Sequence, residues 1–326
     1  MSYIKAISTY VPKKIVTNDE ISERFPEWNS EKIFNKIGIA QRFVSADDEF
    51  ASDLAARAIE NLLSEHSIDK TSIDFLLVCT QSPDYQLPST ACLVQEKVGL
   101  PISCAALDIN QGCSGYIYGL SVADGLIACG NFKNVLLVTV DTYTKYLHPK
   151  DKGNITIFGD GATATLISTE GEYRIGKFTL GTDGTGAENL IIRNGGSKKP
   201  KTSDTEDLDN YLEMKGGKIF SFIVQYIPPV VLENLKLNNE SISSMDLFVF
   251  HQANTHILEK VRQELDIPKE KFVLEMLNYG NTVSSSIPLA FKNHLEQNPE
   301  KANNKVLFVG FGVGYSWGSV CVEKVI

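Results

Sequence analysis

The sequence predicts an α/β fold in which helices cover the sheets. Residues 73–79 and 135–140 are short and almost entirely apolar, as expected of strands that are buried on both faces. Between such runs lie segments with apolar residues at helical spacing, of which residues 52–65 are the clearest. The alternation of the two kinds of segment favours a layered arrangement of sheets and helices.

The order of segments in the first part of the chain returns in the second part. Residues 245–250 resemble residues 73–78 and lie 172 positions later, while residues 306–309 resemble residues 135–138 and lie 171 positions later. A glycine-rich turn before a further strand also recurs in the same order. Because both order and spacing repeat, the chain is predicted to be an internal duplication of one α/β unit.

We therefore predict an N-terminal half over residues 1–170 and a C-terminal half over residues 171–326. A catalytic site would lie where the two halves meet, at strand and helix ends. The other predicted elements are a strand and turn in 1–18, a helix over 19–24 capped by Asn18, a mixed aromatic and basic segment at 25–39, a helix over 89–98, a strand over 104–109, a helix over 116–129, a strand over 162–168, a strand over 319–322 and an exposed excursion at 193–210.

Composition and charge limit the class of protein. With 326 residues, of which 43% are hydrophobic and 22% charged, the chain has the profile of a globular protein with a large core. No apolar run approaches the ~20 residues of a membrane span, and the first residues read as a strand, not a signal peptide. Six scattered cysteines without a CxxC or HExxH pattern favour a reducing cytoplasm and no metal site. The net charge of −9 argues against nucleic-acid binding.

One cysteine stands in a setting that the others lack. Cys113 lies between Gly112 and Gly115, where a strand-like segment passes into the helix-like run that begins at Tyr116. The glycines allow a sharp turn and the close approach of a substrate. The N–H groups and the positive dipole end of a helix favour the thiolate, so we expect Cys113 to be a nucleophile. The remaining cysteines are expected to be apolar filler or strand residues: Cys79, Cys92, Cys104, Cys129 and Cys321.

Three features of the second half complement this cysteine. His251 ends the predicted strand 245–250 and corresponds by offset to Cys79, although a lone histidine there is more often structural. Asn281 lies in a turn before a serine-rich helix start, where a simple turn and cap is the alternative interpretation. The glycine-rich segment 310–319 could direct backbone N–H groups at an oxyanion or form an ordinary tight turn, and it lacks the lysine of a phosphate loop.

Taken together, these motifs resemble the β-ketoacyl–acyl carrier protein synthase III family of the thiolase superfamily of condensing enzymes. The resemblance implies a thiolase-like fold with internally duplicated α/β halves, and it extends over nearly the whole chain. The motifs that carry it are Cys113-Ser114-Gly115, His251-Gln252-Ala253-Asn254, Gly280-Asn281-Thr282, Phe311 with Trp317-Gly318-Ser319, Gly38-Ile39 with Arg42, and Phe158-Gly159-Asp160-Gly161.

The resemblance implies a two-stage acyltransferase reaction without a metal or a permanently bound cofactor. Cys113 takes an acyl group from acyl-coenzyme A, and malonyl on acyl carrier protein then loses carbon dioxide to give an enolate that attacks the acyl-enzyme. His251 and Asn281 would donate hydrogen bonds to the thioester oxygen that becomes negative in the enolate. The backbone N–H groups of Cys113 and Val313 would hold the first oxyanion, and Phe311 would pack against the His–Asn pair.

The substrate-binding residues implied by the resemblance depart from the family's pattern. Trp28 and Lys36 fall in the coenzyme-binding segment with extra residues between them, and Lys36 and Lys152 stand where the family has arginine. Gly217 stands where an asparagine is expected near the pantetheine arm, and His256 stands where an arginine follows the His-Gln-Ala-Asn motif. Lysine lacks the bidentate fork of arginine. The departures leave the chemistry intact but leave the acyl donor and acceptor open.

Three functions therefore remain open at this point. The first is a condensing enzyme that starts or extends fatty acyl chains with acyl-coenzyme A, a malonyl thioester and acyl carrier protein, for which Lys260 and Arg262 are candidate contacts. The second is a relative in specialised metabolism or surface-sugar modification with another donor or acceptor. The third, a non-catalytic subunit, is disfavoured by the complete Cys–His–Asn set. The family's habit also predicts a homodimer in which Leu87 closes the partner's acyl pocket.

Overall fold

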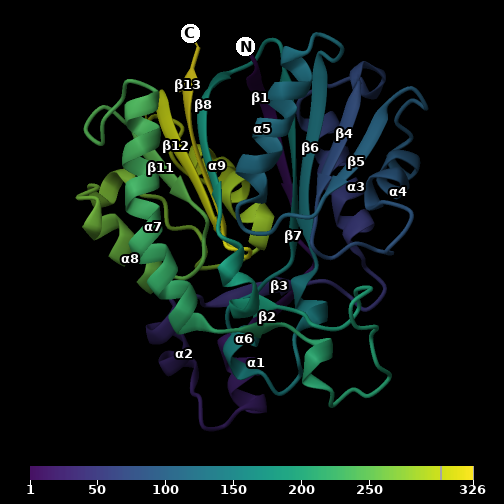
Figure 1. The fold of residues 1–326 in the computed structure, drawn as a ribbon, viewed down its shortest axis with the longest axis vertical. Helices are drawn as coiled ribbons and strands as arrows, with labels where there is room; N and C mark the ends of the chain where they lie inside the picture. Colours follow the sequence, from purple (N-terminus) through teal and green to yellow (C-terminus); the bar gives the residue numbers. More distant parts are fainter. Residues whose placement is uncertain (302, 326) are drawn as a thin grey trace.

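The computed structural model describes residues 1–301 and 303–325 (Figure 1). Nine strands form one mixed sheet in the order β11-β12-β13-β8-β1-β7-β6-β4-β5. Most of these strands are apolar on both faces because helices lie on each side of the sheet. Their bounds are β1 Tyr3–Tyr10, β4 Phe75–Cys79, β5 Ala105–Ile109, β6 Asn134–Asp141, β7 Gly161–Ser168, β8 Tyr173–Thr182, β11 Leu247–Phe250, β12 Lys305–Gly312 and β13 Ser316–Lys324.

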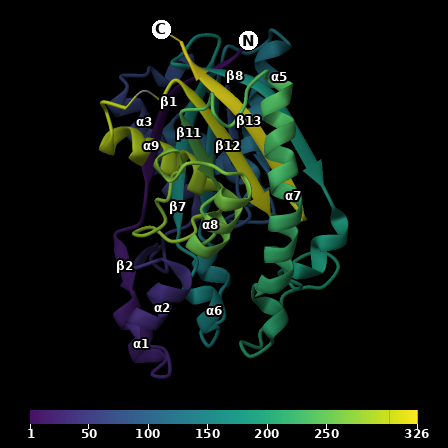
Figure 2. The same cartoon turned by 90° about the vertical axis from the view of Figure 1, so that its left-hand side faces the viewer.

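The sheet and the helices form five layers (Figures 1 and 2). The two parts of the sheet are two of these layers, with helices between them and on both outer faces. Helices α3 (Ala51–Glu65) and α4 (Thr90–Val98) cover the outer face of the β1-β7-β6-β4-β5 part of the sheet. The long α7 (Gly216–Leu237) covers the outer face of the other part and carries α8 (Thr255–Glu264). The central layer, α5 (Gly115–Ala128) and α9 (Ser286–Gln297), contacts strands of both parts.

The predicted duplication is confirmed, and it extends to individual hydrogen bonds. In each half, two parallel strands are followed by an antiparallel one: β4, β6 and β7 in the first half, and β11, β12 and β13 in the second. The Asp74 carboxylate accepts from the N–H groups that open β6, at 2.7 and 2.9 Å. Its counterpart 172 positions later, Asp246, accepts from those that open β12, at 3.0 Å each.

The two halves share one hydrogen-bonded sheet because β1 pairs with β8 at two positions, Tyr3 with Arg174 and Ile4 with Tyr173. The sequence pattern predicted two halves but gave no sign of this junction. The α/β fold predicted from the sequence, with helices covering the sheet, is confirmed. No helix within residues 1–301 and 303–325 combines the length and apolarity needed to cross a bilayer.

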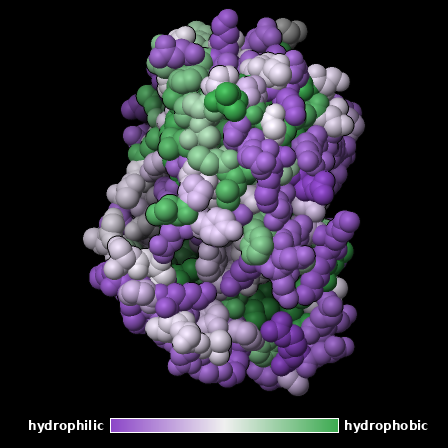
Figure 3. All heavy atoms as spheres, turned by 90° about the vertical axis from the view of Figure 1, so that its right-hand side faces the viewer, coloured by the Kyte–Doolittle hydropathy of each residue, from purple (hydrophilic) through white to green (hydrophobic). Residues whose placement is uncertain are grey.

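The strand β5 forms one edge of the sheet and carries exposed apolar residues. Leu107 on this strand is 47% exposed, and Leu87 in the loop before α4 is 83% exposed. Figure 3 shows the face that carries β5 and α4, on which apolar side chains gather in a strip among hydrophilic ones. An edge strand offers unpaired N–H and C=O groups to another chain, so this face is suited to association.

A small module lies below the sheet in Figure 1 and precedes α3 in the chain. It consists of a hairpin of β2 (Lys14–Thr17) and β3 (Gln41–Val44) with α1 (Asn18–Arg24) and α2 (Ser30–Ile37) between them; the short α6 (Lys152–Ile155) is drawn beside it. We name residues 14–44 the hairpin module. The predicted capping role of Asn18 is wrong, because the Thr17 hydroxyl accepts from Glu20 N–H and forms a capping box.

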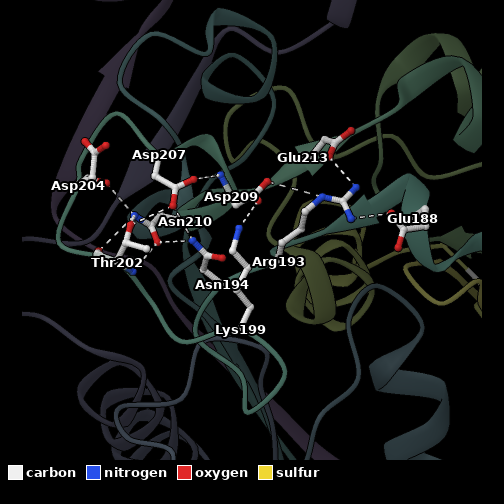
Figure 4. Close-up of polar contacts among 10 residues, drawn as sticks. All are labelled: Glu188, Arg193, Asn194, Lys199, Thr202, Asp204, Asp207, Asp209, Asn210 and Glu213. Carbon is white, nitrogen blue, oxygen red and sulfur yellow. Dashed lines mark hydrogen bonds and ion pairs between the residues drawn. The ribbon is translucent and has the colours of Figure 1, made fainter.

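The predicted excursion at 193–210 is largely exposed but is organised by polar contacts (Figure 4). It is closed at its base by a two-stranded ribbon of β9 (Leu190–Ile191) and β10 (Glu213–Met214). The Arg193 guanidinium pairs with the carboxylates of Glu188, Asp209 and Glu213 at 2.6, 3.7 and 3.0 Å. These pairs bridge the two sides of the ribbon. Two amides of the segment, those of Asn194 and Asn210, are buried and bond each other at 2.9 Å.

The elements that were not predicted from the sequence include β8 and the long helix α7. In α7, Pro228 and Pro229 lie inside the helix and Gly216 and Gly217 lie at its start, which are features that lower local helix propensity. Its buried face includes Ile223, and packing of that face against β8, β12 and β13 outweighs the local preference.

Candidate active site

A cavity of about 660 Å³ opens between the two halves and the hairpin module. It begins among exposed residues of α2 and α8 and reaches Cys113 on the buried side. Most of its wall is apolar, as is usual for a ligand site with a few placed polar groups. The predicted site residues among its lining are Cys113, His251, Asn281, Phe311, Lys36, Gly217 and His256.

Cys113 lies two residues before the first turn of α5, whose N-cap is Ser114. Its side chain is 6% exposed. Burial raises the pKa of the Cys113 thiol to about 12, the nearby Asp141 adds to this, and a hydrogen bond from the Val313 N–H works in the opposite direction. The structure therefore contradicts the expectation of a resting thiolate, because desolvation outweighs the backbone donors at the helix start.

The space around Cys113 is shaped by glycines. A Cβ atom on Gly312 would lie 2.7 Å from the Cys113 Cβ and 2.9 Å from its sulfur. A Cβ atom on Gly112 would lie 2.5 Å from both the Gln81 Oε1 and the Val313 side chain. Both distances are shorter than any ordinary carbon contact. The approach of Cys113 to β12 at this distance thus depends on glycine at 312, whereas a Cβ atom at 112 would displace the ends of the Gln81 and Val313 side chains.

His251 follows β11 and is buried to 2% exposure. Its Nδ1 lies 2.7 Å from the Ser286 hydroxyl oxygen at the start of α9. Burial lowers the pKa of His251 to about 3, so the ring is neutral at physiological pH. A neutral imidazole fixed at one nitrogen presents the other as a single hydrogen-bond donor or acceptor. Phe311 packs edge-on against this ring at a centroid distance of 5.6 Å.

Asn281 is held by its backbone and by its own side chain. Its N–H donates to the Ile157 carbonyl at 2.9 Å, and its carbonyl accepts from the Gly159 N–H at 3.1 Å. Its side-chain Oδ1 accepts from the Val283 N–H at 2.9 Å. Since the amide oxygen is occupied in this way, the Nδ2 group is left as the donor of this cavity-lining residue.

The predicted coenzyme-binding residues form a cluster beside the cavity mouth. The ammonium groups of Lys36 and Lys152 lie 4.8 and 5.6 Å from the centroid of the Trp28 ring. Lys36 lines the cavity, whereas Trp28 and Lys152 lie outside its lining. Lys152 also pairs with the Glu27 carboxylate at 2.8 Å. The cluster combines a flat aromatic surface with two cations, which suits a purine base and its phosphates.

The other predicted contacts are placed unequally. His256 and Gly217 line the outer part of the cavity, and the His256 ring stacks on Phe220 with a centroid distance of 6.1 Å. Leu87 lies outside the cavity lining on an exposed loop. Val313 also lies outside that lining and contributes its N–H to the thiol of Cys113.

Comparisons with known proteins agree with the geometry of the site. The model of the 3-oxoacyl-[acyl-carrier-protein] synthase III family matches residues 107–184, and the model of its C-terminal part matches residues 235–324. A β-ketoacyl-[acyl-carrier-protein] synthase III of Clostridium perfringens is 36% identical over 96% of this chain and 96% of its own length. The chain belongs to the synthase III family.

Solved structures of synthase III proteins agree with this assignment. A crystal structure of a 3-oxoacyl-(acyl-carrier-protein) synthase III superposes with a TM-score of 0.95 at 42% identity, covering 99% of each chain. The crystal structure of a 3-oxoacyl-(acyl-carrier protein) synthase from Burkholderia xenovorans LB400 superposes with a TM-score of 0.90 at 36% identity, covering 99% of this chain and 94% of that one. The family predicted from the motifs, and with it the class of condensing acyltransferases, is confirmed.

Several residues around this synthase III site escaped the sequence analysis. Ser286, which holds His251, lies in the serine-rich helix start, to which no role was assigned. Asp141 ends β6 and accepts from the Ser284 hydroxyl at 2.6 Å and the Gln81 N–H at 2.8 Å. Burial raises the pKa of Asp141 to about 7. The duplication could have drawn attention to both residues. Ser284 lies 171 positions after Cys113, and Asp141 lies 171 positions before Gly312, so each occupies the equivalent place in the other half.

Two predictions about other cysteines are wrong. Cys92 on α4 and Cys129 at the end of α5 are exposed and do not fill the core. Cys79, Cys104 and Cys321 are buried as expected. No group of three or more His, Cys, Asp or Glu side chains placed to hold a metal occurs in the part of the chain that the structure describes.

Proposed function

We propose that this synthase III condenses an acyl group from acyl-coenzyme A with a malonyl thioester, using Cys113, His251 and Asn281. The observation that supports it best is that these three residues, from three distant parts of the chain, line one cavity with an apolar wall. A thiol, a neutral imidazole and an amide donor match the two steps of the reaction.

In the first step, the sulfur of Cys113 bonds to the acyl carbonyl carbon and the bond to the coenzyme sulfur breaks. The Cys113 proton leaves as the new bond forms and ends on the coenzyme thiol, so the step is neutral overall. The raised pKa of Cys113 makes a free thiolate rare, and loss of the proton must accompany attack. The backbone N–H groups of Cys113 and Val313 would stabilise the tetrahedral oxyanion.

In the second step, the malonyl thioester loses carbon dioxide and its carbonyl oxygen becomes an enolate. The Nδ2 of Asn281 and the free ring nitrogen of His251 donate to this oxygen, a stabilisation worth several kcal/mol in a dry site. The enolate carbon bonds to the acyl carbon on Cys113, and the released cysteine sulfur takes a proton from water. A histidine with a pKa of about 3 stays neutral and cannot act as a positive counter-ion.

The coenzyme is proposed to bind with its base and phosphates on Trp28, Lys36 and Lys152, and with its pantetheine arm in the cavity.

The positive side chains of α8 that could bind an acidic carrier protein are already paired within the chain. Lys260 pairs with Glu264 at 2.7 Å, and Arg262 pairs with Glu259 at 2.5 Å. With His256 in place of the expected arginine, this face is less positive than the family pattern implies. That observation keeps the second candidate open, a synthase III of specialised metabolism with another acceptor.

The unit that carries out this reaction is proposed to be a cytoplasmic homodimer paired along β5, with Leu87 reaching the partner's acyl pocket. The exposed edge of β5 and the exposed Leu107 support it. Sedimentation of the parent and of Leu107→Asp tests it, because a buried charge at the interface should shift the dimer towards monomer. A monomeric parent at micromolar concentration would contradict the dimer.

The decisive experiment for the proposed reaction separates its two steps. Cys113→Ser, His251→Ala and Asn281→Ala are each mixed with acetyl-coenzyme A, and the acyl-enzyme is followed by intact mass. Carbon dioxide release is followed in parallel with malonyl-coenzyme A and malonyl–acyl carrier protein. We expect Asn281→Ala and His251→Ala to be acylated but to lose about 10²–10³-fold in carbon dioxide release, because each removes one oxyanion donor.

Cys113→Ser should show the opposite pattern, with acylation lost and some decarboxylation retained. Decarboxylation at the parent rate by Asn281→Ala, together with failed acylation, would overturn the assigned roles and favour an acyltransferase that never decarboxylates. Turnover on malonyl-coenzyme A without any on the carrier-protein thioester would favour the second candidate.

A further inference from the structure

One buried charge near the site has no role in the reaction as described. Arg42 on β3 is 1% exposed and belongs to the largest fully buried side chains. None of the carboxylates in the described residues lies within ion-pair distance of it. Burial lowers the pKa of Arg42 to about 10, so the guanidinium stays charged at neutral pH. The Glu20 carboxylate acts on this pKa in the opposite direction but forms no ion pair with Arg42. A buried charge without a paired counter-ion is costly, which calls for a reason.

The guanidinium of Arg42 bonds only to neutral oxygens, and these belong to two different parts of the fold. On one side it donates to the Val16 carbonyl at 3.2 Å and to the Asn18 Oδ1 at 2.9 Å, both in the hairpin module. On the other side it donates to the Thr156 carbonyl at 2.7 Å, in the segment before β7. Its Nε has no partner. The side chain therefore bridges two segments that are separated by more than a hundred positions.

The segment held through Thr156 is the one that holds Asn281. The next residue, Ile157, accepts the Asn281 N–H, and Gly159 donates to the Asn281 carbonyl. The Arg42 side chain also packs where this segment meets Gly280: Cβ atoms on Gly159 and Gly280 would lie 3.2 and 3.1 Å from the Arg42 Cβ. Gly280 has a φ of +71°, which a residue with a Cβ adopts only with strain.

The hairpin-module side of Arg42 leads to the mouth of the cavity. Asn18 donates through its Nδ2 to the Ile39 carbonyl at 2.7 Å, immediately after the end of α2 at Gly38. Helix α2 carries Lys36, which lines the cavity. A continuous set of hydrogen bonds thus runs from the end of α2 through Asn18 and Arg42 to the loop of Asn281.

We propose that Arg42 is a positioning residue, which joins the coenzyme-binding hairpin module to the Asn281 loop and so sets the place of the Asn281 amide for decarboxylation. The proposal rests on the function proposed above. It follows from the bonds of both guanidinium ends and from the close packing against the two glycines of the loop. Only a long, forked, permanently charged donor reaches both segments at once.

The test compares Arg42→Met and Arg42→Lys with Arg24→Met as a matched control. Arg24 is exposed on the same module and likewise donates to a main-chain carbonyl, that of Pro149 at 3.1 Å, but does not touch the Asn281 loop. For each folded variant, acylation of Cys113 by acetyl-coenzyme A and carbon dioxide release from malonyl-coenzyme A are measured separately. Folding is checked by circular dichroism and thermal unfolding.

For Arg42→Met we expect carbon dioxide release to fall by about 10²-fold, as for a misplacement of about 1 Å in a catalytic group, while acylation stays near the parent rate. Arg42→Lys keeps the positive charge but has a single donor nitrogen, so it should recover part of the loss. It also provides the test if Arg42→Met does not fold. Arg24→Met should match the parent in both steps.

Equal losses in the two half-reactions would overturn the proposal, because they would report a general loss of structure. Unchanged carbon dioxide release in both Arg42 variants would overturn it as well. Asn281→Ala is measured alongside: if it decarboxylates at the parent rate, the assigned role of Asn281 fails and the positioning role fails with it. If Asn281→Ala is impaired but the Arg42 variants are not, only the positioning role fails.

Discussion

The most direct consequence of the site geometry concerns Gly312 on β12, which lies against Cys113, the proposed nucleophile. In Gly312→Ala the new methyl group would lie 2.7 Å from the Cys113 Cβ and 2.9 Å from its sulfur. Carbon contacts are optimal at about 3.5–4.0 Å, so Cys113 or the strand must move by about 1 Å. Such overpacking costs about 1–3 kcal/mol in unfolding free energy.

The effect on catalysis should be larger than the effect on stability. A displacement of about 1 Å in a reacting group costs on the order of 10²-fold in rate, so acylation of Cys113 should fall by about that factor. The measurement is the rate of acyl-enzyme formation with acetyl-coenzyme A by intact mass, on protein shown to be folded at the assay temperature.

Gly125→Ala is the matched control for this substitution. Gly125 is an exposed position inside α5, and a Cβ atom there would meet nothing within 4 Å. This variant should acylate at the parent rate and gain about 0.5–1 kcal/mol in unfolding free energy, because alanine loses less conformational entropy than glycine in a helix. Acylation of Gly312→Ala at the parent rate would show that Cys113 is not confined as described.

Two further predictions follow from the burial of Asp141 and from the Trp28 cluster. The pKa of Asp141 rises from 3.8 to about 7 on folding, so the folded state holds this proton more tightly than the unfolded state. Between these two pH values, the unfolding free energy therefore falls by about 1.4 kcal/mol for each unit by which the pH rises. The stability of Asp141→Asn relative to the parent should therefore increase from pH 4 to 7 and level off above, and parallel urea-unfolding profiles would contradict this. Trp28→Ala should raise KM for acetyl-coenzyme A about 2- to 30-fold with little change in kcat, and an unchanged KM in steady-state kinetics would remove Trp28 from the coenzyme site.

The sequence alone determined the parts of this protein that depend on local patterns. Apolar runs with helical segments between them located β4, β6 and α3 to within two residues, because burial on both faces leaves a clear local mark. The repeat spacing revealed the duplication, since both halves keep the same lengths between strands. The motifs around Cys113, His251 and Asn281 identified the family, because each lies at a strand or helix end where the backbone turn demands particular residues.

Only the tertiary structure showed the properties that depend on residues far away in the sequence, namely burial, pKa and long-range hydrogen bonds. The thiol of Cys113 has a raised pKa because the other half of the chain buries it, which its flanking glycines and helix start could not reveal. Arg42 looks like an ordinary strand residue until the Thr156 carbonyl is placed beside it. Burial and hydrogen bonding are set by neighbours in space, whereas a sequence pattern reports only neighbours along the chain. The residues proposed to react were therefore visible in the sequence, and the environment that tunes them came from the packing of the two halves.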